Sequence, residues 1–263
     1  MSAANPRFSA PQAFGRITVV GGGCYGGYYV RQLRRAVAAG AVRCAGVTVV
    51  DRDAACPVAR RVGAGDPLVR VEIADWRAHF ARYLAAARRD GDAAEDAIVP
   101  SPLMPHLLRD WLVDAARTRW PGRDVRVAPL RATPHVPWER AAPDGTHYVS
   151  FATWMCPINC IEPAVCPHTK GPRDWSMAPA IREYAAAQAD PGTAREPILF
   201  QCTHRAYGVG MIDVRDVLAA DAAIAASGAI GAPVDVLVGT VSHCHGALSR
   251  VVVAAEPAVG QLP

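Results

Sequence analysis

Apolar runs of strand length alternate with helical patterns through the first half of the chain. Residues 16–20 and 46–50 are short β-branched runs, and residues 25–39 between them have the length and spacing of a helix. The alternation continues, with strands expected at residues 68–73, 97–99 and 124–128 and helices near residues 76–84 and 103–115. Strands that alternate with helices predict an α/β fold in which a parallel sheet is covered on both faces.

The pattern becomes irregular and rich in proline after residue 132. Pro143, Asp144 and Gly145 form a turn signal between two strand-like segments, residues 136–140 and 146–151, so a hairpin is expected there. Further helices are expected near residues 179–188 and 214–226, with strands at residues 198–201, 234–241 and 250–255. The pattern therefore divides the chain into a flexible tail (1–15), an α/β domain (16–132) and a smaller α+β region (133–263).

The first expected strand runs directly into a glycine-rich turn. Gly21, Gly23 and Gly26 fit the G-x-G-x-x-G pattern between a strand and a helix. The first glycine allows the tight turn, the second lets the backbone approach a pyrophosphate, and the third lets the helix pack close to the strand. Asp51 ends the second expected strand, where a carboxylate accepts hydrogen bonds from ribose hydroxyls and favours NAD. The neighbouring Arg52 keeps NADP as the alternative.

Residues 16–55 resemble the NAD-binding Rossmann domains of dehydrogenases. They also resemble the nucleotide-sensing domains of potassium-uptake regulators, which begin with the same strand, glycine turn and helix. The resemblance implies a Rossmann-like dinucleotide-binding domain over residues 16–132. The residues expected to contact the dinucleotide are Gly21, Gly23, Cys24, Tyr25, Gly26 and Asp51.

The second half of the chain gathers cysteines in a way that is typical of metal sites. Cys156, Cys160 and Cys166 form a Cys-x3-Cys-x5-Cys segment, and Cys202 follows a short apolar run. Thiolates bunched like this suit an iron–sulfur cluster or zinc. We expect a [4Fe–4S] cluster held by all four cysteines, with zinc as the close alternative and unligated thiols as the remaining one. The region 133–263 is therefore expected to be a metal-binding region.

Three histidines stand near the ends of expected strands in this region. His204 follows Cys202 by two residues, and His243 and His245 flank Cys244. Residues two apart in an extended segment point to the same face, so Cys202 and His204 should share one face. If the strands before Cys202 and His243 are neighbours, these histidines complete a metal site or transfer a proton. We therefore take His204, His243 and His245 as the candidate catalytic residues.

Charge and hydropathy limit the partners. The formal net charge of +4 comes from scattered residues and does not require a nucleic acid, because an anionic cofactor accounts for it equally well. The longest apolar-rich region, residues 222–241, is broken by glycine, proline and aspartate, and the first 15 residues lack a signal-peptide core. We expect a cytoplasmic protein without membrane contact. Its partner is a small-molecule substrate or an electron-transfer protein, and a homo-oligomer remains open.

The two motifs together predict an NAD-linked oxidoreductase with an iron–sulfur or zinc centre. Three alternatives stay open. The first is a non-catalytic nucleotide or redox sensor. The second is a protein whose zinc site is purely structural. The third is an enzyme whose Rossmann domain binds another nucleotide-containing ligand, such as S-adenosylmethionine.

Overall fold

The computed structural model describes residues 11–63, 65–91, 93–188 and 196–257, and these residues form two compact units. Unit 1 comprises Met1–Pro105, Met155–Asp174 and Cys202–Asp216. Unit 2 comprises His106–Trp154, Trp175–Gln201 and Val217–Pro263. The units therefore interleave along the sequence, and the chain passes between them several times.

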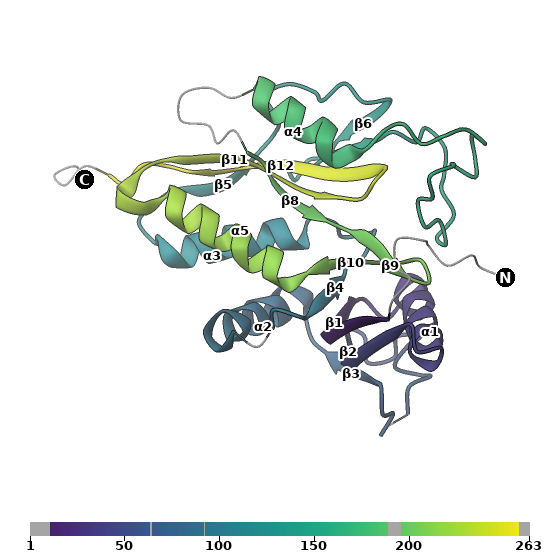
Figure 1. Ribbon diagram of the computed structural model, residues 1–263. Helices are drawn as coiled ribbons and strands as arrows, with labels where there is room; N and C mark the ends of the chain where they lie inside the picture. The colour runs from purple at the N-terminus through teal and green to yellow at the C-terminus, as the bar shows by residue number, and fades with distance from the viewer. Residues whose placement is uncertain (1–10, 64, 92, 189–195, 258–263) are drawn as a thin grey trace. The chain divides into compact units, whose positions relative to one another are not determined.

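Unit 1 is built on a mixed six-stranded sheet in the order β3-β2-β1-β4-β10-β9 (Figure 1). Its strands are β1 (Gln12–Val20), β2 (Val42–Asp51), β3 (Val69–Ile73), β4 (Ala97–Val99), β9 (Thr203–Ala206) and β10 (Val209–Asp213). The first four strands are parallel to one another. β10 pairs antiparallel with β4, and β9 pairs antiparallel with β10.

Two helices cover the opposite faces of this sheet. Helix α1 (Cys24–Ala38) packs on alternate residues of β1, Ile17 and Val19, in the main apolar core. Helix α2 (Trp76–Asp90) lies on the other face, where its His79 contacts Glu72 of β3 at 3.0 Å. The alternation of side chains along each strand thus supplies both faces with packing residues.

Unit 2 is a second mixed sheet, in the order β6-β7-β12-β11-β8, with β5 also paired to β12. Its strands are β5 (Val125–Ala128), β6 (Trp138–Ala141), β7 (His147–Ser150), β8 (Ile198–Gln201), β11 (Val234–Val241) and β12 (His245–Val253). Its helical segments are α3 (Leu107–Arg119), α4 (Met177–Ala187), most of α5 (Val214–Ser227) and the 3₁₀ turn Ala229–Gly231. β6 and β7 form the expected hairpin, with Gly145 at a φ of +81° in its turn.

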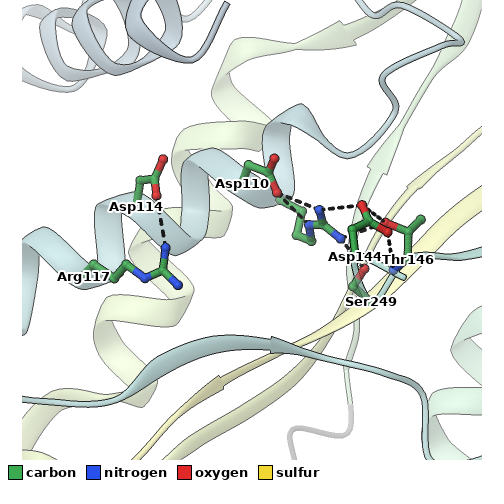
Figure 2. Close-up of polar contacts among 7 residues, drawn as sticks. Asp110, Asp114, Arg117, Asp144, Thr146 and Ser249 are labelled. Carbon is green, nitrogen blue, oxygen red and sulfur yellow. Dashed lines mark hydrogen bonds and ion pairs between the residues drawn. The ribbon is translucent and has the colours of Figure 1, made fainter. Parts of the chain in front are cut away.

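A buried polar cluster ties α3 to the second sheet (Figure 2). Arg109 of α3 is 6% exposed, and its Nη1 donates to the hydroxyls of Thr146 at 2.8 Å and Ser249 at 2.9 Å. Its Nη2 donates to the Asp110 carboxylate at 2.7 Å and lies 3.4 Å from Asp144. The cluster joins a helix, a hairpin turn and a central strand. Figure 2 also draws the more exposed pair Asp114 and Arg117, with N and O atoms 3.6 Å apart.

The α/β class is confirmed, and the expectation of a parallel sheet needs correction. Each sheet is mixed. In unit 1, β10 runs antiparallel to its neighbours β4 and β9. In unit 2, β11 is antiparallel to β12 and parallel to β8. β5, which we expected in the parallel sheet, pairs antiparallel with β12 in unit 2. β1 begins at Gln12, four residues before the expected start, because Gln12 pairs with Val42. The expected tail otherwise lies outside the described residues. Within the described residues, no helix is long and apolar enough to cross a membrane.

Candidate functional site

The three glycines of the turn between β1 and α1 differ in their surroundings. Gly21 has a φ of +84°, in the left-handed region that glycine reaches at little cost. A Cβ on Gly26 would lie 1.8 Å from the carbonyl oxygen of Gly21, so only glycine permits this close approach of the helix. A Cβ on Gly23 would meet no atom within 4 Å. The first glycine is thus required by its backbone conformation, the third by close packing, and the second faces open space.

The open glycine marks the start of α1. Gly23 is the N-cap, its carbonyl accepts the N–H of Gly27 at 2.8 Å, and no side chain caps it. The first N–H groups of a helix have no acceptor within the helix and carry a partial positive charge. Cys24 and Tyr25, which supply two of these groups, are both exposed. This end of α1 is therefore suited to anionic oxygens.

The Asp51 carboxylate at the end of β2 is tied to the glycine turn. Its Oδ2 accepts the N–H of Gly22 at 2.6 Å, and its Oδ1 accepts the N–H of Asp53 at 2.9 Å. The Gly22 carbonyl accepts the N–H of Val58 at 3.0 Å, so the turn is held from both sides. A carboxylate oxygen accepts more than one hydrogen bond, so Asp51 can still receive hydroxyl groups.

The turn between β9 and β10 lies at the same edge of the sheet as the glycine turn. β10 is antiparallel to β4 and β9 is antiparallel to β10, so β9 runs in the direction of β4 (Figure 1). The turn at Tyr207 and Gly208 therefore follows the carboxyl end of β9, just as the glycine turn follows that of β1. Ligands of open α/β sheets bind outside the carboxyl ends of the strands.

Cys202 and His204 share a face beside β10, as their spacing predicts. A Cβ on Gly210 would lie 2.6 Å from Cys202 Sγ and 3.7 Å from His204 Cε1. His204 Nδ1 lies 3.0 Å from the Gly208 carbonyl oxygen, which only accepts, so Nδ1 is the protonated nitrogen. His204 Nε2 lies 3.7 Å from Oε2 of Glu162. The thiol, the imidazole and the carboxylate thus form one cluster, here called the His204 cluster.

Glu162 is the member of the His204 cluster that sequence reasoning did not assign to the site. It belongs to residues 155–174, here called the cysteine loop, and lies between Cys160 and Cys166. Its φ of +50° is unusual for a residue with a Cβ. Its place between two cysteines was the only signal that the sequence offered. The cysteine loop therefore reaches β9 through a carboxylate.

The surroundings of Cys202 keep its sulfur protonated. Burial of the sulfur and then the Glu162 carboxylate raise the pKa of Cys202 to about 12, against the opposing effect of Arg205. Burial and then Cys202 also raise the pKa of Tyr29 in α1 to about 12. Metal ligation requires a thiolate, so a metal at Cys202 would have to displace this proton.

Cys166 is in the opposite electrostatic situation. The N–H of Thr169 and then that of His168 donate to its sulfur, and they lower the pKa of Cys166 to about 7 although burial opposes the shift. The surrounding turn is closed by two backbone hydrogen bonds of 2.9 Å, from Cys166 to Gly171 and from Lys170 to Cys166. Cys166 is buried, and Cys156 and Cys160 are half-buried. None of these three cysteines forms a disulfide.

The expected metal ligands are not gathered at one point. Among the residues that the structure describes, no three His, Cys, Asp or Glu side chains form a group that could hold a metal ion. Cys156, Cys160, Cys166 and Cys202 all belong to unit 1. The iron–sulfur cluster and its zinc alternative stay predictions.

His243 and His245 lie in unit 2, at the turn between β11 and β12. β8 and β11 are parallel neighbours, so the strands before Cys202 and His243 do lie side by side. His245 Nδ1 lies 2.9 Å from the hydroxyl of Ser150, and Cys244 Sγ accepts the indole N–H of Trp175 at 3.3 Å. The His243 carbonyl accepts the N–H of Met177. These contacts stabilise the turn between β11 and β12. The catalytic roles of His243 and His245 stay predictions.

Comparison with known proteins finds one family. No curated protein and no solved structure matches the chain. Residues 108–254, more than half of the chain, match a family model described as "Uncharacterized protein, C-terminal domain". The match includes the cysteine loop and the three candidate histidines and leaves out the glycine turn. The chain therefore belongs to this family, AF_1314_C.

Proposed function

We propose that unit 1 is a Rossmann-like dinucleotide-binding domain and that the protein is an NAD-linked oxidoreductase. The glycine turn carries the proposal, because Gly21 has a φ of +84°, Gly26 is closely packed against the Gly21 carbonyl, and Gly23 is open where a pyrophosphate would approach. The order β3-β2-β1-β4 of the parallel strands supports it, since these are the first four positions of the order 3-2-1-4-5-6 of dinucleotide-binding sheets.

Different residues at the carboxyl edge of the sheet bind different groups of the dinucleotide. The N–H groups that begin α1 bind the pyrophosphate, and Asp51 binds the ribose hydroxyls. NAD is favoured over NADP, because a carboxylate repels a 2′-phosphate. The nicotinamide ring, when bound, accepts a hydride from the substrate.

His204 is the proposed proton acceptor for an alcohol substrate. Its Nδ1 carries a proton and faces a carbonyl, so Nε2 of the neutral ring has a free lone pair. Nε2 would accept the hydroxyl proton of an alcohol whose C–H hydride left to a bound dinucleotide, which would give a carbonyl product. Glu162, 3.7 Å from Nε2, stabilises the resulting imidazolium.

A metal centre on the cysteine loop is a second, separate proposal. It is favoured by the N–H groups of His168 and Thr169, which stabilise the thiolate of Cys166 as N–H donors do at metal-bound sulfur. Metal and sulfide analysis of protein purified without oxygen, with a visible spectrum, tests it. Iron with labile sulfide supports a cluster, bound zinc supports a zinc site, and metal-free protein contradicts both.

Calorimetric titration with NADH tests the dinucleotide site. The Gly23→Ala variant is expected to fold normally, because its methyl group meets no atom within 4 Å, and to bind NADH at least about tenfold more weakly. Gly122→Ala is the matched control, since its methyl group is equally unopposed and lies in unit 2. If the wild type fails to bind, the proposal is wrong. Binding without turnover would instead support the non-catalytic sensor.

A further inference from the structure

Trp76 is fixed beside the glycine turn by a shared backbone oxygen. Its indole Nε1–H donates to the carbonyl oxygen of Val50 at 2.9 Å. The same oxygen accepts the N–H of Gly21 at 2.9 Å. Trp76 is the first residue of α2, and the side chain of Asp75 caps that helix by accepting the N–H of Arg77 at 2.9 Å. The indole is therefore held in place next to the glycine turn by a hydrogen bond to β2, the strand that ends in Asp51.

Arg52 lies over the indole ring of Trp76. Its guanidinium carbon is 4.4 Å from the centre of the Trp76 ring, which is a cation–π stack. Arg52 directly follows Asp51, is exposed, and donates no hydrogen bond to any residue that the structure describes. The indole therefore covers one side of the guanidinium. The opposite side is left for a ligand, one residue after the carboxylate assigned to the ribose.

We propose that the stacked Arg52 and Trp76 pair is the binding surface for a purine base, so that the ligand is an adenine nucleotide. This rests on the proposed function, because the ribose is assigned to Asp51 and the pyrophosphate to the start of α1. Bases stack on guanidinium planes and on aromatic rings, and this contact needs a flat face instead of free N–H groups. A 2′-phosphate would bring negative charge to the ribose position assigned to Asp51, and a carboxylate there repels it. The charge of Asp51 therefore favours a ribose without a 2′-phosphate, with the base on Arg52.

Calorimetric titration of four ligands with a small set of variants tests this surface. The ligands are NAD, NADP, AMP and nicotinamide mononucleotide, which lacks the purine. In Arg52→Ala, NAD and AMP should bind about tenfold more weakly, while binding of nicotinamide mononucleotide is unchanged. Arg52→Lys keeps the charge and loses the plane, so it should not restore binding. Arg43→Ala, an exposed arginine early in β2, controls for the lost charge.

The outcomes separate this inference from the proposed function. Unchanged NAD and AMP affinity in Arg52→Ala overturns the purine surface and leaves the dinucleotide site intact. A loss confined to NADP also overturns it and assigns Arg52 to a 2′-phosphate. A wild-type protein that binds AMP and not NAD keeps the surface and rejects the dinucleotide proposal. Binding of none of the four ligands overturns both.

Discussion

Two arginines show how differently one side chain is used in the two units. Arg109 of unit 2 is buried, and its guanidinium donates to a carboxylate and two hydroxyls at 2.7 to 2.9 Å (Figure 2). Arg52 of unit 1 is exposed and uses the face of its guanidinium, against Trp76. A buried guanidinium is stable only when its donors are satisfied, whereas an exposed one is satisfied by water until a ligand displaces it.

The difference suggests which polar residues hold the fold and which face a ligand. The partners of Arg109 come from a helix, a hairpin turn and a central strand, so its loss would disturb three elements at once. The contact of Arg52 with Trp76 joins two residues at one edge of the sheet, beside the proposed ribose site. Burial with full hydrogen bonding thus marks a structural arginine.

The largest effect is expected for Arg109→Met. The substitution leaves Asp110, Thr146 and Ser249 without their buried donor, so the free energy of unfolding should fall by about 3 kcal/mol. Urea unfolding at neutral pH measures it. A loss below about 1 kcal/mol would show that the cluster is not a structural tie.

The Arg34 and Asp66 pair is an intermediate case, because Arg34 is 40% exposed and Asp66 is 13% exposed. The Arg34 side chain, followed by the N–H groups of Val69 and Leu68, lowers the pKa of Asp66 from 3.8 to about 2. A carboxyl group with a lowered folded-state pKa stabilises the fold above its unfolded pKa, and this stability is lost as the pH falls from 3.8 to about 2.

Asp66→Asn should therefore flatten this part of the acid unfolding curve. Urea midpoints measured at a series of pH values between 5 and 2 would show the effect, with this range bracketing the two pKa values of Asp66. Asp124→Asn, which replaces an exposed carboxylate in unit 2, is the control. An unchanged slope in Asp66→Asn would contradict the assignment.

Arg52→Ala should change stability by only about 0.5 kcal/mol, because an exposed cation–π contact contributes little. Thermal unfolding and urea unfolding both measure this. The small cost, set beside weakened nucleotide binding, would distinguish Arg52 sharply from Arg109. A destabilisation comparable to that of Arg109→Met would instead make Arg52 structural.

The smallest effect is expected for Arg126→Ala. Arg126 pairs with Asp124 across exposed side chains, with 55% and 58% of their surfaces accessible. Such pairs contribute about 0.2 kcal/mol or nothing measurable. Urea unfolding should therefore barely distinguish this variant from the wild type. A clear loss of stability would show that burial does not separate structural arginines from the others.

The local elements could be predicted well, and their partners could not. β4 occupies the expected residues 97–99, and the hairpin turn falls at Asp144 and Gly145 as expected. β5 was also expected where it lies, but its partner β12 is more than 100 residues away. Periodicity reports which face of an element is buried and says nothing of which strand lies beside it.

In the candidate site, too, residues close in sequence could be predicted and contacts between distant residues could not. Gly21, Gly23, Gly26 and Asp51 belong to one short βαβ segment, so their spacing predicted their role as a group. Glu162 meets His204 from a loop 42 positions away, and no local pattern points to that contact. Trp76 lies in the helix expected near residues 76–84, but its contact with Arg52 depends on how β2 and α2 are arranged.

The α/β class, the glycine turn at the end of β1 and the position of Asp51 at the end of β2 could all be read from the sequence. These features follow from side-chain periodicity and from the conformational freedom of glycine, which act over a few residues. Only the tertiary structure decided that β10 and β9 extend the first sheet and that the cysteine loop belongs to unit 1. It also decided that Cys202 stays protonated while Cys166 tends to ionise. Strand pairing and the effect of Glu162 on Cys202 arise from groups distant in sequence, because neighbouring charges act through space.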